Sequence, residues 1–168
     1  MKIYQLDECI NSKKLETACR DEGKCMPHRF PKAHKGKGVK DPQVLAMFFS
    51  QGKVIVTNDK AMLREHVENI PELHPGLILI KFSDECKYEI DDQESAKILR
   101  HVKSKIPNWS SLACENSIAV ATEKGLEILH KKDNKLLRNE GADYSDANFA
   151  DKIEAALKEN SKRKPLPF

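Results

Sequence analysis

The stretch VIVTNDKAM, Val54 to Met62, sets the fold class of this chain. Its opening residues, up to Thr57, form an apolar, β-branched run that is typical of a buried strand. The run then stops abruptly in Asn58, Asp59 and Lys60. An amide, a carboxylate and an amine at the end of a buried strand raise a chemical question rather than a folding one.

A second stretch ends in the same way. KIYQLDEC, Lys2 to Cys9, is a largely apolar run that closes in Asp7 and Glu8. Because the carboxyl ends of parallel strands meet at one edge of a sheet, two strands that each deliver carboxylates there predict a functional site at that edge.

Strands and helices alternate through the first half of the chain. The patterns predict strands at 3–6, 24–28, 54–57 and 76–82, and helices at 11–22, 41–52 and 60–67. Asp41 and Pro42 are typical of a helix start, and Gly52 of a helix end. Alternation with short connections predicts an α/β fold, a three-layer α/β/α doubly wound and mainly parallel sheet with right-handed crossovers.

The second half predicts different elements. An amphipathic helix is expected at 91–105, two or three short antiparallel strands within 117–137, and a helix at 143–159. We therefore expect residues 1–137 to form the main domain, closed by a β-hairpin, and residues 138–168 to form a C-terminal helix and basic tail. Three roles stay open for that helix: packing on the domain, dimerisation, or a surface for a protein partner.

Composition excludes several classes of protein. The 168 residues suit one core, since compact domains usually have about 100 to 200 residues. The mean hydropathy is -0.61, and the longest apolar run, at 76–82, is far shorter than the roughly 18 to 20 residues of a membrane span. The five scattered cysteines contain no C-x-x-C pair, which argues against a zinc or disulfide framework. With no signal-peptide pattern at its start, we expect a cytoplasmic protein.

Four acids are expected to gather at one edge of the sheet. Asp7, Glu8 and Asp59 follow strands, and Asp41 opens a helix that should begin at the same edge. Crowded carboxylates stay ionised together only if a cation lies between them, and hard oxygen ligands favour Mg²⁺ or Mn²⁺ over zinc. Taken singly, each acid also suits a helix cap or a turn, so both interpretations stay open.

The net charge of +3 does not by itself require a nucleic-acid partner, but the distribution of charge is uneven. The segment HRFPKAHKGKGVK, His28 to Lys40, has no acid. Its candidate phosphate-binding residues are Arg29, Lys32, Lys35, Lys37 and Lys40. Such a segment attracts a phosphate backbone, although a solvated loop explains it equally well.

The order of these motifs resembles a known family. LDE after the first strand, KDPQVLAMF opening a helix, then VIVTNDKAM and HPGLILIKF are similar to the compact bacterial PIN-like nucleases, the group related to the C-terminal domain of Mut7. SIAVATEKGLEILHK, at 117–131, resembles their closing hairpin, and the resemblance covers 1–132. It implies a Mg²⁺- or Mn²⁺-dependent endoribonuclease that cleaves RNA, frequently the toxin of a toxin-antitoxin pair. Its implied partners are an RNA substrate and an antitoxin protein. A second copy of the chain is a partner left open for the C-terminal helix, which lies beyond the resemblance.

The resemblance also implies roles for individual residues. Asp7, Glu8, Asp41 and Asp59 would hold the metal, and three of them, Asp7, Asp41 and Asp59, would be catalytic together with Thr57. The Thr57 hydroxyl would orient a carboxylate or a water. Lys60 would contact phosphate.

Two departures from the family pattern affect the expected activity. Ala61 and Met62 stand where the family commonly has a second Asp and a Phe. One carboxylate is therefore missing, which weakens the case for a second metal. The alternative hypothesis is a catalytically weakened PIN-like module that binds RNA or a protein.

Overall fold

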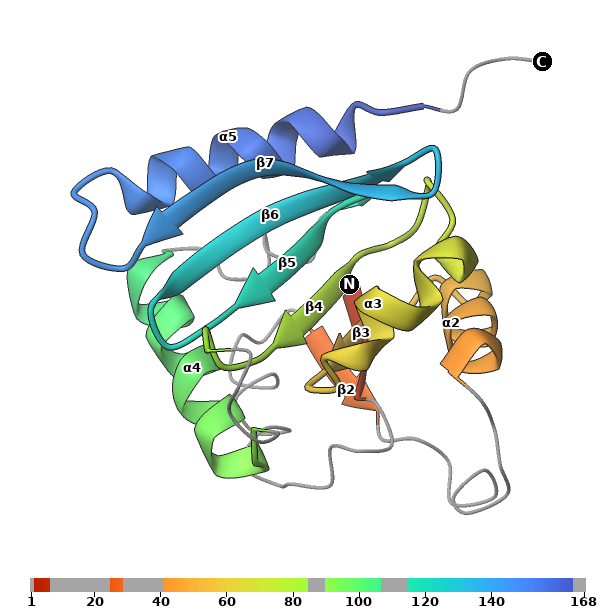
Figure 1. Cartoon of the computed structure of the whole chain (residues 1–168), viewed down its shortest axis with the longest axis horizontal. Coiled ribbons are helices and arrows are strands. Elements are labelled where there is room, and N and C mark those ends of the chain that lie inside the picture. The colour runs from red at the N-terminus through yellow and green to blue at the C-terminus, as the bar shows by residue number, and fades with distance from the viewer. Residues whose placement is uncertain (1, 7–24, 29–40, 85–89, 107–114, 165–168) are drawn as a thin grey trace.

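The computed structural model describes residues 2–6, 25–28, 41–84, 90–106 and 115–164, with the backbone alone at 2–3, 25–28 and 41–44. One mixed sheet of seven strands organises them, in the order β2-β1-β3-β4-β5-β6-β7 (Figure 1). The strands are β1 (Lys2–Leu6), β2 (Cys25–His28), β3 (Val54–Thr57), β4 (Leu77–Ile80), β5 (Ile118–Ala121), β6 (Gly125–Lys132) and β7 (Lys135–Asp143). The helices are α2 (Asp41–Ser50), α3 (Ala61–His66), η2 (Val67–Asn69), α4 (Asp92–Lys105) and α5 (Phe149–Ser161).

The first five strands are parallel, and a hairpin closes the sheet. β1 lies between β2 and β3, and β4 and β5 follow in parallel register. β6 and β7 are antiparallel to their neighbours. The structure thus confirms an α/β fold with a mixed, mainly parallel sheet, a C-terminal antiparallel hairpin and a helix.

Every residue of β3 and β4 is buried, so both faces of the central sheet must be covered. Ile55, Leu77 and Leu79 pack on one face with α2 and α3. Val56 and Ile78 pack on the other face with α4 and α5. Alternation of side chains along a strand divides the core into these two clusters.

The expectation of right-handed crossovers is wrong for one connection. The β3-α3-β4 and β4-α4-β5 connections step in the same direction across the sheet, yet α3 and α4 lie on opposite faces. Two such crossovers must have opposite hands, although about 98% of crossovers are right-handed. The physical reason is coverage: with α2 and α3 on one face, the apolar stripe of α4 buries the other.

The C-terminal helix begins later than the sequence predicts. Asp143 still belongs to β7, where it pairs with Gly125. Its Oδ1 then accepts hydrogen bonds from the backbone N–H and the hydroxyl of Ser145, at 2.8 and 2.7 Å. These contacts make a turn, and α5 begins only at Phe149. Of the roles left open for this helix, packing on the domain is the one seen, because Phe149 and Ile153 lie in the same core as α4.

A buried amide fastens the end of α5 to the sheet. Asn160 is fully buried, and its Nδ2 donates to Ser117 Oγ at 3.1 Å and to the Leu129 carbonyl at 3.3 Å. Its own carbonyl accepts from Asn116 Nδ2 at 3.1 Å. Buried amides are stable only when bonded, so this network fixes where α5 docks.

No helix among the described residues is long and apolar enough to span a membrane.

His74, which precedes β4, is a buried titratable group. Its side chain is 5% exposed, and its ring lies 5.1 Å from that of Phe49, centroid to centroid. Neither ring nitrogen has a hydrogen-bond partner within the described part of the chain. Burial, and after it the nearby charge of Lys131, lowers the pKa of His74 from 6.5 to about 4. The folded protein therefore holds this imidazole neutral.

We expect His74 to make the protein acid-sensitive. Between pH 6.5 and 4 the unfolded chain binds a proton at His74 that the folded chain does not. The free energy of unfolding therefore falls as the pH is lowered through that window, by up to about 1.4 kcal/mol per pH unit. Urea melts from pH 7 to 4 should show a shallower decline for His74→Gln than for wild type. His101→Gln, at an exposed position, is the control and should keep the wild-type slope; equal slopes for all three proteins would contradict the assignment.

Candidate functional site

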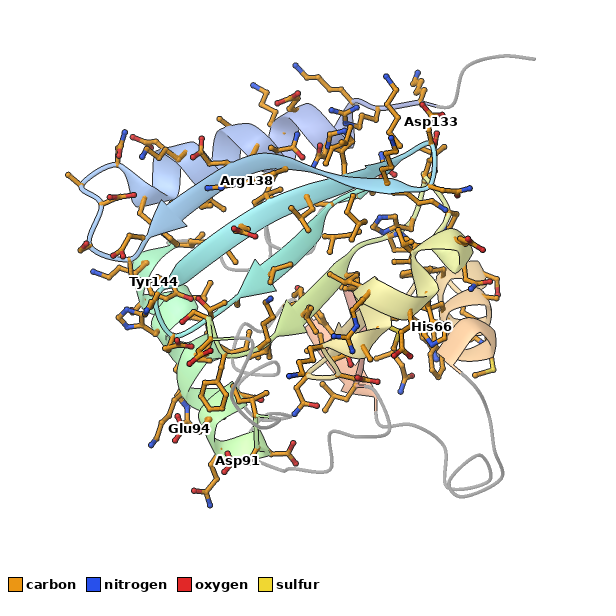
Figure 2. The ribbon with its side chains drawn as sticks, in the orientation of Figure 1. His66, Asp91, Glu94, Asp133, Arg138 and Tyr144 are labelled. Carbon is orange, nitrogen blue, oxygen red and sulfur yellow. The ribbon has the colours of Figure 1, made fainter. Side chains whose placement is uncertain are left out.

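The chain leaves β3 and β4 toward opposite faces of the sheet. β3 continues into α3 on one face, and the next helix after β4, α4, lies on the other. In open α/β sheets, ligands bind in the crevice outside the carboxyl ends of the strands, next to the point where the strand order reverses, which in this sheet lies between β1 and β3. We call the edge formed by residues 57–60 and 81–84, together with the start of α4, the switch point. Figure 2 labels Asp91 and Glu94 at the start of α4, at the end of the molecule toward which β4 and β5 point.

A tight turn organises the end of β3. Thr57 is fully buried, and its Oγ1 accepts the backbone N–H of Asp59 at 3.1 Å. Asp59 Oδ1 accepts the N–H of Ala61 at 3.0 Å, and the Asp59 carbonyl accepts the N–H of Met62 at 3.0 Å. The side chains of Thr57 and Asp59 therefore satisfy backbone donors that the first turn of α3 would otherwise leave unpaired.

Asn58 joins this turn to α4. Its side chain is 8% exposed, and Nδ2 donates to Asp92 Oδ1 and to Ser95 Oγ, both at 3.3 Å. Ser95 Oγ in turn donates to the Asp91 carbonyl at 2.8 Å, and Asp91 Oδ1 caps α4 by accepting the N–H of Glu94 at 2.8 Å. The start of α4 is thus held against the end of β3.

The structure places three of the predicted site residues at the switch point, namely Thr57, Asp59 and Lys60. Asp41 is the first residue of α2, as expected, but only its backbone is described. The predicted residues that lie outside the described part of the chain are Asp7, Glu8, Arg29, Lys32, Lys35, Lys37 and Lys40. Among the described residues, no group of three or more His, Cys, Asp or Glu is arranged to hold a metal ion. The four-acid metal site thus remains a prediction.

The backbone places the ends of β1 and β3 next to each other. Leu6, the last residue of β1, pairs with Val56 of β3. Asp7 follows Leu6 in the sequence, just as Thr57 follows Val56. The expected convergence of the two carboxylate-bearing strand ends therefore rests on an observed parallel pairing.

The oxygen donors at the switch point suit a hard divalent cation. Asp59 is partly exposed, and its Oδ2 accepts no hydrogen bond from the described residues, because only Oδ1 is used by the turn. Asp92 contributes a second carboxylate close to Asn58. Carboxylate oxygens without sulfur or imidazole favour Mg²⁺ or Mn²⁺.

Sequence reasoning did not find Asp92. The residue lies 34 positions beyond Asn58, and only the packing of α4 on this face of the sheet brings the two together. The available signal was the pair Asp91 and Asp92 at a helix start, which is also what ordinary capping requires.

Comparison with protein-family models, with curated proteins and with solved structures found no match to this chain.

We expect Asn58 and Ser95 to act as a unit in stabilising the switch point. Asn58→Ala leaves Ser95 Oγ without a buried donor and should lower the free energy of unfolding by about 1 to 2 kcal/mol. Asn148→Ala is the matched control, since Asn148 is exposed and makes no side-chain cap; it should change stability by less than about 0.5 kcal/mol. The double-mutant cycle consists of Asn58→Ala, Ser95→Ala and the variant that combines them. Urea melts of these three proteins, of wild type and of the Asn148→Ala control give the free energies of unfolding. Additive losses would show that the Asn58–Ser95 hydrogen bond contributes nothing.

Proposed function

We propose that the protein is a metal-dependent endoribonuclease that hydrolyses RNA phosphodiesters at the switch point. The observation that carries the proposal is the parallel pairing of β1 with β3, because the sequence continues from these two strands into Asp7 and Asp59. The arrangement of acids behind buried parallel strands is also what the PIN-like resemblance implies. On that resemblance we further propose that the protein acts in the cytoplasm as the toxin of a toxin-antitoxin pair.

The residues have distinct roles in this proposal. Asp7, Glu8, Asp41 and Asp59 would hold Mg²⁺ or Mn²⁺, which when bound would activate a water and stabilise charge on the phosphate oxygens. Thr57 fixes the backbone of Asp59 through the 3.1 Å hydrogen bond, and the N–H of Ala61 orients the Asp59 carboxylate through Oδ1. Lys60, directly after Asp59 in the sequence, would contact the substrate phosphate. The basic residues between Arg29 and Lys40 would bind the RNA backbone.

A weakened module that binds RNA or a protein is the second candidate, and one observation favours it. Asp59 Oδ1 is used by the N–H of Ala61, at the position where the family pattern would add an acid. This hydrogen bond gives the Asp59 carboxylate a structural role in the turn that does not require a cation. The two candidates differ in one property, which is whether RNA is cleaved when a divalent cation is added.

The acids are tested by replacing each of Asp7, Asp41 and Asp59 with Asn. Asn keeps the size and one oxygen acceptor but removes the charge, so an acid that serves only as a cap or in a turn should leave cleavage unchanged. If the acids hold a metal, cleavage of a pooled RNA in Mg²⁺ or Mn²⁺ should fall by about 100-fold or more, since several kcal/mol of transition-state stabilisation is lost. EDTA should abolish wild-type cleavage.

Asp151→Asn is the matched control, because Asp151 is an exposed acid on α5. It should cleave RNA like wild type. Added Mg²⁺ or Mn²⁺ should raise the melting temperature of wild type and of this control, and should do so much less in the three site variants. The proposal fails if all three site variants cleave RNA and respond to metal as the control does. Growth arrest on expression that disappears in Asp59→Asn would support the toxin assignment.

A further inference from the structure

One face of the sheet is left open by the described helices. α2 and α3 cover β3 and β4, and their core cluster extends to Ile118 and Val120 of β5, but none of the described helices covers the same face of β6 and β7 (Figure 1). In the register of these strands Val120 pairs with Glu127, and Glu127 with Gly141, so the three lie side by side on this face. Leu129 and Leu136 lie further along it, partly buried. The open face therefore has an aliphatic floor.

Two adjacent hollows on this face share part of their lining. The first, of about 340 Å³, is lined by Lys81, Lys124 and Arg138 among others. The second, of about 270 Å³, is lined by Lys60 and Arg64 on the α3 side. Lys81, Val120 and Glu127 line both hollows. We call this surface, with its five cations Lys60, Arg64, Lys81, Lys124 and Arg138, the basic groove.

The positive charge of the basic groove favours an anionic ligand. Its five cations face two acids, Glu127 and Asp143. Among the residues that line the two hollows, the cations exceed the acids by three. Arg64 also lies 3.8 Å from Glu65, and both of these side chains are largely exposed, so this pair is weak. Glu127 lies 4.0 Å from Arg138, but the two side chains are 48% and 60% exposed, so the pair is weak and leaves Arg138 able to bind an anion.

Arg138 lies against the bare backbone of Gly141. A Cβ at Gly141 would occupy the place of the Arg138 guanidinium, so only glycine permits this position of the side chain. Figure 2 labels Arg138 on β7. An exposed guanidinium over an open sheet face is well suited to phosphate, which it can bind through two parallel N–H donors.

The basic groove begins at the switch point. Lys60 directly follows Asp59, and Lys81 directly follows β4. A strand whose scissile phosphate lay at Asp59 would therefore continue into the groove past these two lysines.

From the geometry we infer that the basic groove binds the single-stranded RNA that extends from the cleavage site, an inference that rests on the proposed function. Hollows of 340 and 270 Å³ are at the lower end of the sizes of small-ligand sites and suit one strand rather than a duplex. No aromatic ring lines either hollow among the described residues. Binding is therefore driven by charge, depends strongly on salt and tolerates changes of base sequence.

The test is RNA binding by full-length protein in EDTA, where cleavage is suppressed. The groove variant is Arg64→Gln, Lys81→Gln and Arg138→Gln combined; the control combines Lys97→Gln, Lys105→Gln and Lys158→Gln, exposed cations on α4 and α5. Both lose three charges. Anisotropy of a short fluorescein-labelled single-stranded RNA at several salt concentrations gives affinity and salt slope. The groove variant should bind at least about tenfold more weakly, with a slope shallower by about 2, since each phosphate contact to a single strand contributes about 0.7. The control should stay within about twofold of wild type.

Several outcomes would overturn the inference. Equal losses in groove variant and control would mean that net charge alone governs binding. Duplex RNA that competes as well as single-stranded RNA would exclude the single-strand assignment. A labelled polyglutamate that binds as tightly as RNA, and is lost in the groove variant, would assign the groove to an acidic protein. Should the triple variant fail to fold, Arg138→Gln alone should lower the slope by about 0.7.

Failure of the proposed function is distinguished by the acid variants. Asp59→Asn should keep the wild-type RNA affinity in EDTA while losing cleavage in Mn²⁺. The groove variant should show the reverse: cleavage of saturating RNA is retained and KM is raised. If neither wild type nor any variant cleaves RNA, yet the groove variant binds RNA more weakly than wild type, the nuclease proposal fails and the groove assignment stands.

Discussion

Burial of β3 and β4 on both faces is the constraint on which the rest of the structure depends. All eight residues of these strands are buried, and alternate side chains point to opposite faces. Helices are therefore required on both faces, and here the chain leaves β3 and β4 toward opposite faces to supply them. The switch point follows directly from this requirement, because the ends of β3 and β4 diverge there. Polar residues can occupy that edge without disturbing either core cluster.

Much of this organisation could be predicted from local sequence. Asp41, Pro42 and Gly52 bracket a helix through backbone preferences that act over a few residues, and the β-branched run at Val54 predicts its strand for the same reason. The start of α5 was predicted six residues too early, because Asp143 can serve either as a helix cap or as the end of a strand. Asp143 belongs to the strand because it pairs with Gly125, and a sequence pattern does not reveal that pairing.

Long-range packing explains what sequence reasoning missed. An amphipathic stripe shows that α4 is buried on one side but not which face of the sheet it covers. The contact between Asn58 and Asp92, and the unusual hand of one crossover, both depend on that choice. The basic groove was equally hidden, since Arg138 reaches over Gly141 only in the register that follows the irregularity at Ile128 and Leu129. Candidate acids followed from strand ends and a helix start, whereas cations from α3, from the residue after β4 and from β7 meet only in the folded sheet.

The docking of α5 has a consequence for how the protein is made. Leu126 and Ile128 of the hairpin face the core that α5 completes, and Asn160 is the residue that fastens the helix in place. During synthesis this apolar side of the hairpin stays uncovered until residues 149–161 have emerged from the ribosome. The sheet is then nearly complete but still exposes apolar surface, and nascent chains in this state aggregate or bind chaperones. Chains interrupted between β7 and α5 should therefore be far less soluble than the full-length protein.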